Sequence, residues 1–214
     1  MTDIFFKHLA TMPILAVLRG ITPSEVVTVG ETLVQAGITL LEVTMDSPDA
    51  ATSLTKLHQH FGNQIFLAAG TVLKPEQVAE AKMAGAKAII APNLQQSVIM
   101  ASKSHGLLSL PGVFTPTECF SALDHGADGL KLFPGDGLSP KVVAGLRAVL
   151  GKDIILIVTG GVNADNLSQW LLAGLNGVGI GTALYKPGKA QADLRLAAGQ
   201  FVQSVRTAQT QGWR

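Results

Sequence analysis

A glycine that recurs every 20–25 residues constrains the fold of this chain more than any other feature of its sequence. Each of these glycines follows a helix-like stretch and precedes, within a few residues, an apolar run that is often β-branched. Glycine readily adopts the left-handed conformation that ends many helices. Each interval therefore predicts one helix followed by one strand, and the glycines concerned are Gly37, Gly62, Gly85, Gly106, Gly126, Gly151 and Gly174.

The apolar runs between these glycines predict eight strands. Several runs are apolar on both faces, which is typical of parallel strands that are covered on both sides. The predicted strands are Ile14–Leu18, Leu40–Thr44, Ile65–Ala69, Ala88–Ala91, Leu107–Leu110, Gly129–Leu132, Ile154–Val158 and Val178–Ile180.

Proline next to a small polar or basic residue marks the expected helix starts, because proline is favoured in the first turn of a helix. Thr115 and Glu118 also have the spacing of a capping box. The helix-start segments are Thr22-Pro23-Ser24-Glu25, Ser47-Pro48-Asp49, Lys74-Pro75-Glu76, Thr115-Pro116-Thr117-Glu118 and Ser139-Pro140.

Alternating strands and helices are compatible with a closed (β/α)₈ barrel or with an open doubly wound sheet. No Gly-x-Gly-x-x-Gly follows the first strand, and the units are even in length. We therefore predict an α/β protein in which residues 1–214 form a single TIM-barrel domain. Apolar residues make up 47% of the chain, which is enough for a large core. The active site is expected where strands end and the following loops begin.

Charge and cysteine content exclude several classes of partner. The net charge of +1 is spread over interspersed signs, so we expect neither nucleic acid nor a membrane as a partner. The single cysteine, Cys119, cannot form an intramolecular disulfide, which favours a reducing cytoplasm. Met1–Thr11 is mixed in character and the apolar run Pro13–Leu18 is short, so we expect no signal peptide and no membrane span.

Lys131 lies inside the short apolar run Gly129–Leu132, which ends at Phe133-Pro134. Burial of a lysine disfavours its ammonium form and lowers its pKa. A neutral lysine amine is suited to Schiff-base formation with a carbonyl. The competing interpretation is a strand-end lysine whose head group reaches water, and this segment alone does not choose between them.

Glu42 lies in the second strand, where alternation places it on the same face as Leu40 and Thr44. A carboxylate in so apolar a strand is costly unless it has a partner, and its pKa can rise into the range useful for proton transfer. Glu42 and Lys131 come from opposite arcs of the expected barrel and point into one mouth. This placement is compatible with proton transfer to and from a ligand bound between them, and also with a structural ion pair.

Glycine-rich turns follow the last two strands, at Thr159-Gly160-Gly161 and Gly181-Thr182. Such turns let backbone N–H groups approach an anion, and this fold often binds phosphate after its seventh and eighth strands. We expect a phosphate site there rather than simple tight turns. Arg19, at the end of the first strand, suits a carboxylate, a phosphate or a rim salt bridge, and Thr71 suits a substrate or its own loop.

No metal site is expected. The five histidines do not group at strand ends with cysteine or acidic residues, and Cys119 falls on an expected helix, where packing is its simplest role.

Short motifs in order along nearly the whole chain resemble the class I KDPG/KDPGal aldolases, barrel enzymes that cleave 6-phosphorylated 2-keto-3-deoxy sugar acids. Singly several motifs are weak, but together they are highly specific. The motifs are Ala16-Val17-Leu18-Arg19-Gly20-Ile21-Thr22-Pro23, Leu41-Glu42-Val43-Thr44, Ala69-Gly70-Thr71-Val72-Leu73, Ala91-Pro92-Asn93, Pro111-Gly112, Leu130-Lys131-Leu132-Phe133-Pro134, Thr159-Gly160-Gly161-Val162 and Gly179-Ile180-Gly181.

The resemblance implies that Lys131 forms a Schiff base with the 2-keto group and that Glu42 donates and accepts protons. It implies that Arg19 and Thr71 hold the pyruvyl carboxylate end, and that the products are pyruvate and D-glyceraldehyde 3-phosphate. It also implies a homotrimer that needs no metal or organic cofactor. The remaining substrate contacts implied are Pro92, Pro111, Phe133, Thr159, Gly160, Gly161, Gly181 and Thr182.

Two positions point to different branches of this family. Arg19 and the segment Asp46-Ser47-Pro48 resemble the galactonate branch, whereas Thr159 resembles the gluconate branch. We expect 2-dehydro-3-deoxy-6-phosphogalactonate (KDPGal) as the substrate, with the gluconate epimer (KDPG), or both, as the alternative. More remote alternatives are another phosphate-binding barrel isomerase or synthase and a non-catalytic phosphosugar-binding protein.

Overall fold

The computed structural model describes residues 2–213 and contains nine parallel strands in one sheet. All eight predicted strands agree with the structure to within one residue at each end, and the fifth continues after Pro111 in a short second part that was not predicted. The strands are β1 (Ile14–Leu18), β2 (Leu40–Thr44), β3 (Phe66–Gly70), β4 (Ala88–Ile90), β5 (Leu108–Leu110), β6 (Gly112–Val113), β7 (Gly129–Leu132), β8 (Ile155–Thr159) and β9 (Gly177–Ile180).

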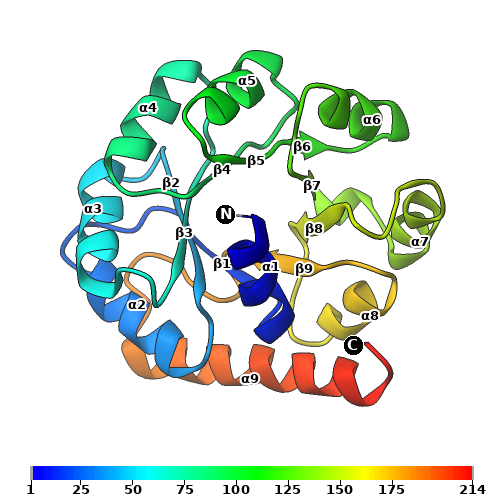
Figure 1. The fold of residues 1–214 in the computed structure, drawn as a ribbon. Helices are drawn as coiled ribbons and strands as arrows, with labels where there is room; N and C mark the ends of the chain where they lie inside the picture. The colour runs from blue at the N-terminus through cyan, green and yellow to red at the C-terminus, as the bar shows by residue number, and fades with distance from the viewer. Residues whose placement is uncertain (1, 214) are drawn as a thin grey trace.

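Pro111 interrupts the fifth strand just after its predicted end at Leu110, because proline has no N–H to donate to a neighbouring strand. The first part, β5, pairs with β4, and the second part, β6, pairs with β7. Backbone bonds cross the remaining gap, since Asp128 N donates to Ser109 O at 2.9 Å and Lys131 N to Pro111 O at 2.9 Å. With β5 and β6 taken as one interrupted strand, the sheet is the predicted (β/α)₈ barrel (Figure 1).

Helices surround the barrel, and α9, at 20 residues, packs against α2 and α8 (Figure 1). None of the helices within residues 2–213 is long and apolar enough to cross a membrane. The helices are α1 (Thr2–Thr11), α2 (Val26–Gln35), α3 (Ala50–Phe61), α4 (Pro75–Met83), α5 (Gln96–Ser104), α6 (Pro116–Asp124), α7 (Pro140–Val149), α8 (Leu167–Leu172) and α9 (Gln191–Thr210), with the 3₁₀ turn η1 (Gly135–Gly137).

The glycine and proline signals are largely confirmed. Six of the seven recurring glycines have positive φ, but Gly151 does not, because α7 ends in an extended residue, Leu150. Thr115 and Glu118 form the predicted capping box at the start of α6. Pro23 and Pro48 stand before their helices rather than in the first turn, since α2 begins at Val26 and α3 at Ala50.

Helix α1 was not predicted, and it lies across the amino-terminal end of the barrel (Figure 1). Its Phe5 and Leu9 are buried, and the Phe5 ring packs on Phe66 with centroids 4.9 Å apart. These side chains fill the end of the barrel that faces away from the predicted active site.

Strand residues alternate between two apolar clusters. Leu40, Phe66 and Ile155 face the barrel interior, whereas Leu41 and Val43 pack in the outer cluster beneath the helices. Positions two residues apart share a face, so each inward-facing row continues toward the carboxyl end of its strand. Polar residues and glycines are concentrated at those ends.

Candidate active site

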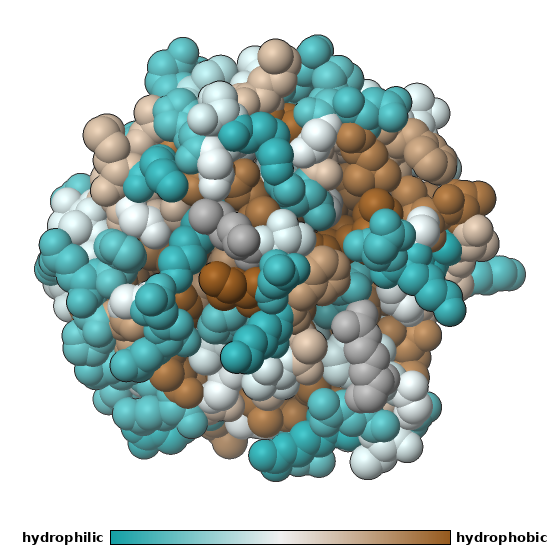
Figure 2. Space-filling view, in the orientation of Figure 1, coloured by the Kyte–Doolittle hydropathy of each residue, from teal (hydrophilic) through white to brown (hydrophobic). Residues whose placement is uncertain are grey.

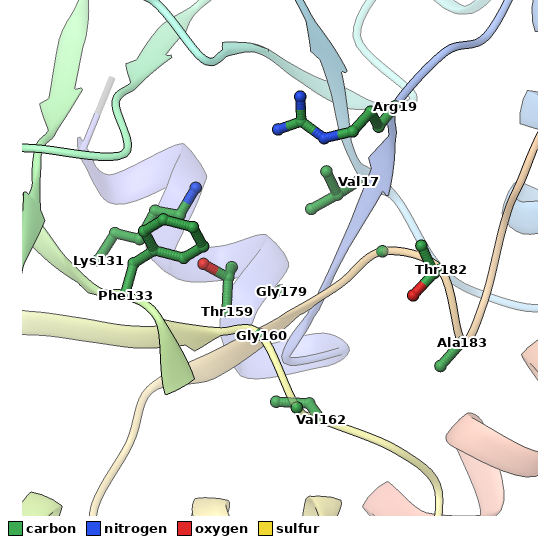
Figure 3. A pocket seen from close by; sticks show the side chains of 12 residues that line it. Val17, Arg19, Lys131, Phe133, Thr159, Gly160, Val162, Gly179, Thr182 and Ala183 are labelled. Carbon is green, nitrogen blue, oxygen red and sulfur yellow. The ribbon is translucent and has the colours of Figure 1, made fainter. Parts of the chain in front are cut away.

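The inward-facing rows end in a cavity of about 260 Å³ at the carboxyl end of the barrel (Figure 3). Its walls come mainly from the ends of β1, β7, β8 and β9. The lining residues are Val17, Arg19, Lys131, Phe133, Thr159, Gly160, Gly161, Val162, Gly179, Gly181, Thr182 and Ala183.

Lys131 projects from β7 into this cavity beside Phe133, whose ring centroid is 5.0 Å from Nζ (Figure 3). The lysine is only 5% exposed. Burial lowers its pKa from the ordinary value, the Glu42 carboxylate opposes this effect, and the Arg19 guanidinium adds to it. The side chain therefore gives up its proton more readily than an exposed lysine does.

Glu42 is fully buried on β2, and neither of its carboxylate oxygens has a hydrogen-bond partner in the structure. Burial raises its pKa, and the opposing charges of Lys131 and Arg19 reduce that effect. A carboxyl group in this environment holds a proton more strongly than an exposed glutamate and can exchange it with a neighbouring ligand.

Gly70, on the adjacent strand β3, makes room for Glu42. A Cβ built on Gly70 would lie 2.5 Å from Glu42 Cδ and 2.7 Å from its Cγ, and it would overlap Oε1. The two residues are offset neighbours on the inner face, since Glu42 pairs with Ala68 and Thr44 with Gly70. The sequence motif contained Gly70, but its role as the space that the carboxylate occupies was missed.

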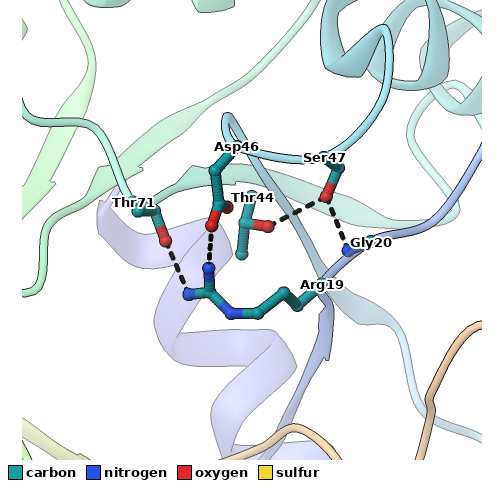
Figure 4. Close-up of polar contacts among 6 residues, drawn as sticks. All are labelled: Arg19, Gly20, Thr44, Asp46, Ser47 and Thr71. Carbon is teal, nitrogen blue, oxygen red and sulfur yellow. Dashed lines mark hydrogen bonds and ion pairs between the residues drawn. The ribbon is translucent and has the colours of Figure 1, made fainter.

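Arg19 lies on the wall opposite Lys131, and its guanidinium is held by two side chains (Figures 3 and 4). One amino group forms an ion pair with Asp46, and the other donates to Thr71 Oγ1 at 2.8 Å. Thr71 has a φ of +55°, a left-handed conformation that is uncommon for a threonine. Arg19 therefore forms the rim salt bridge that was one of its interpretations, and it also lines the cavity.

Ser47 fixes the loops that carry this pair. Gly20 N donates to Ser47 Oγ at 2.9 Å, and Ser47 Oγ shares a hydrogen bond of 2.9 Å with Thr44 Oγ1 (Figure 4). The ends of β1 and β2 are thereby joined directly beneath Arg19 and Asp46.

The glycine turn after β8 has two consecutive positive φ angles, 97° at Gly160 and 67° at Gly161. A Cβ on Gly161 would lie 2.7 Å from Asp136 Oδ1, so the turn also needs glycine because η1 packs closely upon it. Gly181, after β9, has no atom within 4 Å of where its Cβ would be and opens onto the cavity.

Thr159, at the end of β8, faces the cavity with a hydroxyl that is buried and without a hydrogen-bond partner (Figure 3). Its methyl group occupies the space left by Gly179, where a Cβ would overlap Cγ2. The side chain is therefore fixed in direction, with a hydroxyl that has no partner among residues 2–213.

Several predicted site residues lie beside the cavity rather than in its wall. Glu42 lies beside Gly70, and Thr71 accepts a hydrogen bond from Arg19. The carbonyl oxygen of Pro111 accepts a hydrogen bond from the backbone N–H of Lys131. Pro92 packs against Gly112, where an added Cβ would overlap its carbonyl group.

Four lining residues were not predicted: Val17, Val162, Gly179 and Ala183. Strand alternation identifies Val17, which is two residues before Arg19 and is the only residue of β1 that is not fully buried. The motifs contained Val162 and Gly179 without assigning them to the site, and no sequence signal marks Ala183.

Among residues 2–213 no group of three or more histidine, cysteine or acidic side chains is arranged to hold a metal ion. Cys119 is buried in α6, as expected for a packing residue.

Comparison with known proteins gives a consistent result. A family model described as KDPG and KHG aldolase matches residues 6–195. The 2-dehydro-3-deoxy-6-phosphogalactonate aldolase of Escherichia coli K12 is 38% identical over 92% of this chain and 96% of its own length. A probable aldolase of the same name from Rhizobium meliloti is 36% identical over 87% of this chain and 88% of its own length.

Solved structures agree with these relatives. A native KDPGal structure superimposes with a TM-score of 0.90 at 37% identity and covers 93% of this chain and 97% of its own. The KDPG aldolase of Legionella pneumophila, in which pyruvate is captured as a covalent carbinolamine, superimposes with a TM-score of 0.78 at 25% identity and covers 95% of this chain and 97% of its own. The match of the family model over most of the chain, together with these relatives, means that this protein belongs to the KDPG and KHG aldolase family.

Proposed function

We propose that this protein is a class I, metal-independent aldolase that cleaves KDPGal to pyruvate and D-glyceraldehyde 3-phosphate. The observation that carries the proposal is the pairing of a buried lysine with a buried, unpartnered carboxyl group on the inner face of one barrel mouth. The names and similarity of the E. coli and R. meliloti relatives support the substrate.

Lys131 is the proposed nucleophile. Its neutral amine attacks the 2-keto carbon, and the resulting carbinolamine takes a proton from Glu42 and loses water to give a protonated imine. The imine withdraws electrons as the C3–C4 bond breaks, the C4 hydroxyl loses its proton, and the aldehyde leaves. The enamine that remains is protonated at C3, and hydrolysis releases pyruvate and the free lysine.

Glu42 is the proposed proton carrier for these steps. Burial raises its pKa, so it holds a proton more strongly than an exposed glutamate and can still return to the carboxylate while a ligand is bound. It gives its proton as the carbinolamine loses water, takes up the proton of the C4 hydroxyl, and returns that proton to C3, directly or through water.

The remaining residues bind the ends of the substrate. Arg19 and Thr71 already form one hydrogen-bonded unit at the rim, which suits the substrate carboxylate. The turns at Gly160-Gly161 and Gly181-Thr182 offer backbone N–H groups to the phosphate. Phe133, Pro92 and Pro111 form the apolar surroundings of Lys131.

The decisive test is cleavage of KDPGal by the purified protein, with pyruvate detected through lactate dehydrogenase and oxidation of NADH. We expect turnover that Lys131→Met abolishes and that Lys152→Met, an exposed lysine, retains. Binding of KDPGal without turnover would instead favour a phosphosugar-binding protein. Full activity of Lys131→Arg on some other phosphorylated substrate would favour a barrel isomerase or synthase.

KDPG is the alternative substrate, and one observation favours it. The Thr159 hydroxyl is buried, unpartnered and directed into the cavity, so it can bond a substrate hydroxyl of suitable configuration. Assays on both epimers at equal concentration separate a galactonate enzyme, a gluconate enzyme and a dual-specificity enzyme by their kcat/KM values.

We also propose that the protein acts as a homotrimer in the cytoplasm. An apolar groove between α6 and α7 exposes 45% of Phe120 and 60% of Val149, and it appears as a brown area over these helices in Figure 2. Surfaces of this kind are typical of contacts between subunits. The free thiol of Cys119 and the phosphorylated substrate are compatible with a cytoplasmic location.

A further inference from the structure

A second cavity, lined mainly by residues with polar side chains, lies at the opposite end of the barrel from Lys131, where α1 crosses the amino-terminal ends of the strands (Figure 1). Its volume is about 380 Å³. The proposed reaction does not use it. The lining residues are Ile4, Lys7, His8, Thr11, Thr39 and Asn63.

Hydrogen-bond donors from separate elements meet at this cavity. His8 Nδ1, on α1, lies 2.7 Å from Thr39 Oγ1, just before β2. Lys87, just before β4, donates from Nζ to Asn63 Oδ1 at 3.2 Å. These bonds leave the amide nitrogen of Asn63, the second ring nitrogen of His8 and the ammonium group of Lys7 available to a ligand.

Positive charge here has no acidic partner. Within the part of the chain from residue 2 to residue 213, no carboxylate forms an ion pair with Lys7, His8 or Lys87, although Asp3 lies one helical turn before Lys7. The pKa of His8 is lowered mainly by burial, and the positive charges of Lys87 and Lys7 lower it further. Like charges this close to one another are stabilised by an anion placed among them.

We propose that this cavity binds a small dianion of the phosphate class, either inorganic phosphate or a phosphate monoester. The bound dianion accepts hydrogen bonds from Lys7 on α1, from Asn63 before β3 and from His8, with Lys87 adding charge from the side. It thereby links α1 to the loops that precede three strands and stabilises the helix that closes this end of the barrel. Because the dianion favours the protonated imidazole, its binding raises the pKa of His8 and is tighter at lower pH.

Sulfate is the probe, because it has the shape of phosphate and remains a dianion across the titration range of histidine. The side-chain resonances of the five histidines are followed by NMR as a function of pH, and His8→Gln identifies the resonance of His8. In chloride we expect a His8 pKa below the ordinary 6.5. In sulfate at equal ionic strength we expect the pKa to rise by about 1 unit or more. Sulfate bound at the Gly160-Gly161 turn does not imitate this result, since that turn lies at the other end of the barrel.

Lys7→Met is the variant that tests the site, because Lys7 is exposed and methionine has a similar helix propensity. We expect this change to remove at least half of the sulfate-induced shift. Lys141→Met, at an exposed position at the start of α7, should leave the shift intact. A His8 pKa that is the same in chloride and sulfate would overturn the proposal, and so would an undiminished shift in Lys7→Met.

Discussion

Replacing Gly70 with alanine tests the placement of Glu42, because the three atoms nearest to the new methyl group all belong to that glutamate. Gly70 does not have a positive φ, so alanine introduces no backbone strain. Glu42 is fully buried and cannot swing into solvent. The added methyl therefore has to displace the carboxyl group from the position that it occupies between β2 and β3.

The expected cost follows from this geometry. Overpacking a buried site by one methyl group reduces the free energy of unfolding by about 1–3 kcal/mol. In a Glu42→Ala background Cγ, Cδ and Oε1 are absent, so Gly70→Ala should cost no more than ~0.5 kcal/mol there. The difference, about 0.5–3 kcal/mol, is the coupling energy between the two positions. Gly70→Ala should also lower kcat by roughly 10²–10⁴-fold, the usual contribution of a positioned acid or base.

Urea unfolding of the parent, the two single variants and the double variant measures this coupling. The kcat values are taken from the pyruvate-release assay. If Gly70→Ala costs the same with and without Glu42, the carboxyl group does not occupy the space beside Gly70. If kcat of Gly70→Ala is close to that of the parent, the position of this carboxyl group does not matter for the reaction.

Three further changes test other parts of the structure. Thr159→Val removes a buried hydroxyl that has no partner, so it should raise the free energy of unfolding by ~1 kcal/mol; it should also shift the ratio of kcat/KM values toward KDPGal by about 10-fold, and a loss of stability in urea would contradict this account. Phe120→Glu places a charge in the apolar groove between α6 and α7 and should dissociate the proposed trimer in analytical ultracentrifugation, whereas an unchanged sedimentation coefficient would locate the interface elsewhere. Burial raises the pKa of Cys119 to about 11, so the folded protein at pH 8 should react with a thiol reagent far more slowly than the protein unfolded in urea, and equal rates would show that the thiol is accessible.

Much of the barrel could be predicted because its strands are short apolar runs that are bounded by glycine. The same alternation that made Leu40 an interior residue also placed Glu42 on the inner face. The second part of the fifth strand, β6, was not predicted, because Pro111 and Gly112 were interpreted as the residues that follow the end of that strand. Helix α1 was missed because its apolar residues pack on the end of the assembled barrel, and the local sequence gives no information about that surface.

The residues that line the cavity were predicted better than the contacts between their side chains. Lys131, Arg19 and Thr159 line the cavity together, as expected from strand ends. The Arg19–Asp46 ion pair and the space beside Gly70 depend on the distance between neighbouring strands and on side-chain direction. Neither quantity is encoded in the spacing of residues along the chain.

Lys131 is the residue on which the proposed chemistry depends, and borohydride reduction in the presence of pyruvate tests it most directly. Because the lysine pKa is lowered by burial, adduct formation should rise with pH toward a midpoint below 10.5. Peptide mass mapping after reduction should find a reduced pyruvyl group on Lys131 and on no other lysine. A folded protein that forms no adduct, or that carries it on a different lysine, would contradict the Schiff-base mechanism.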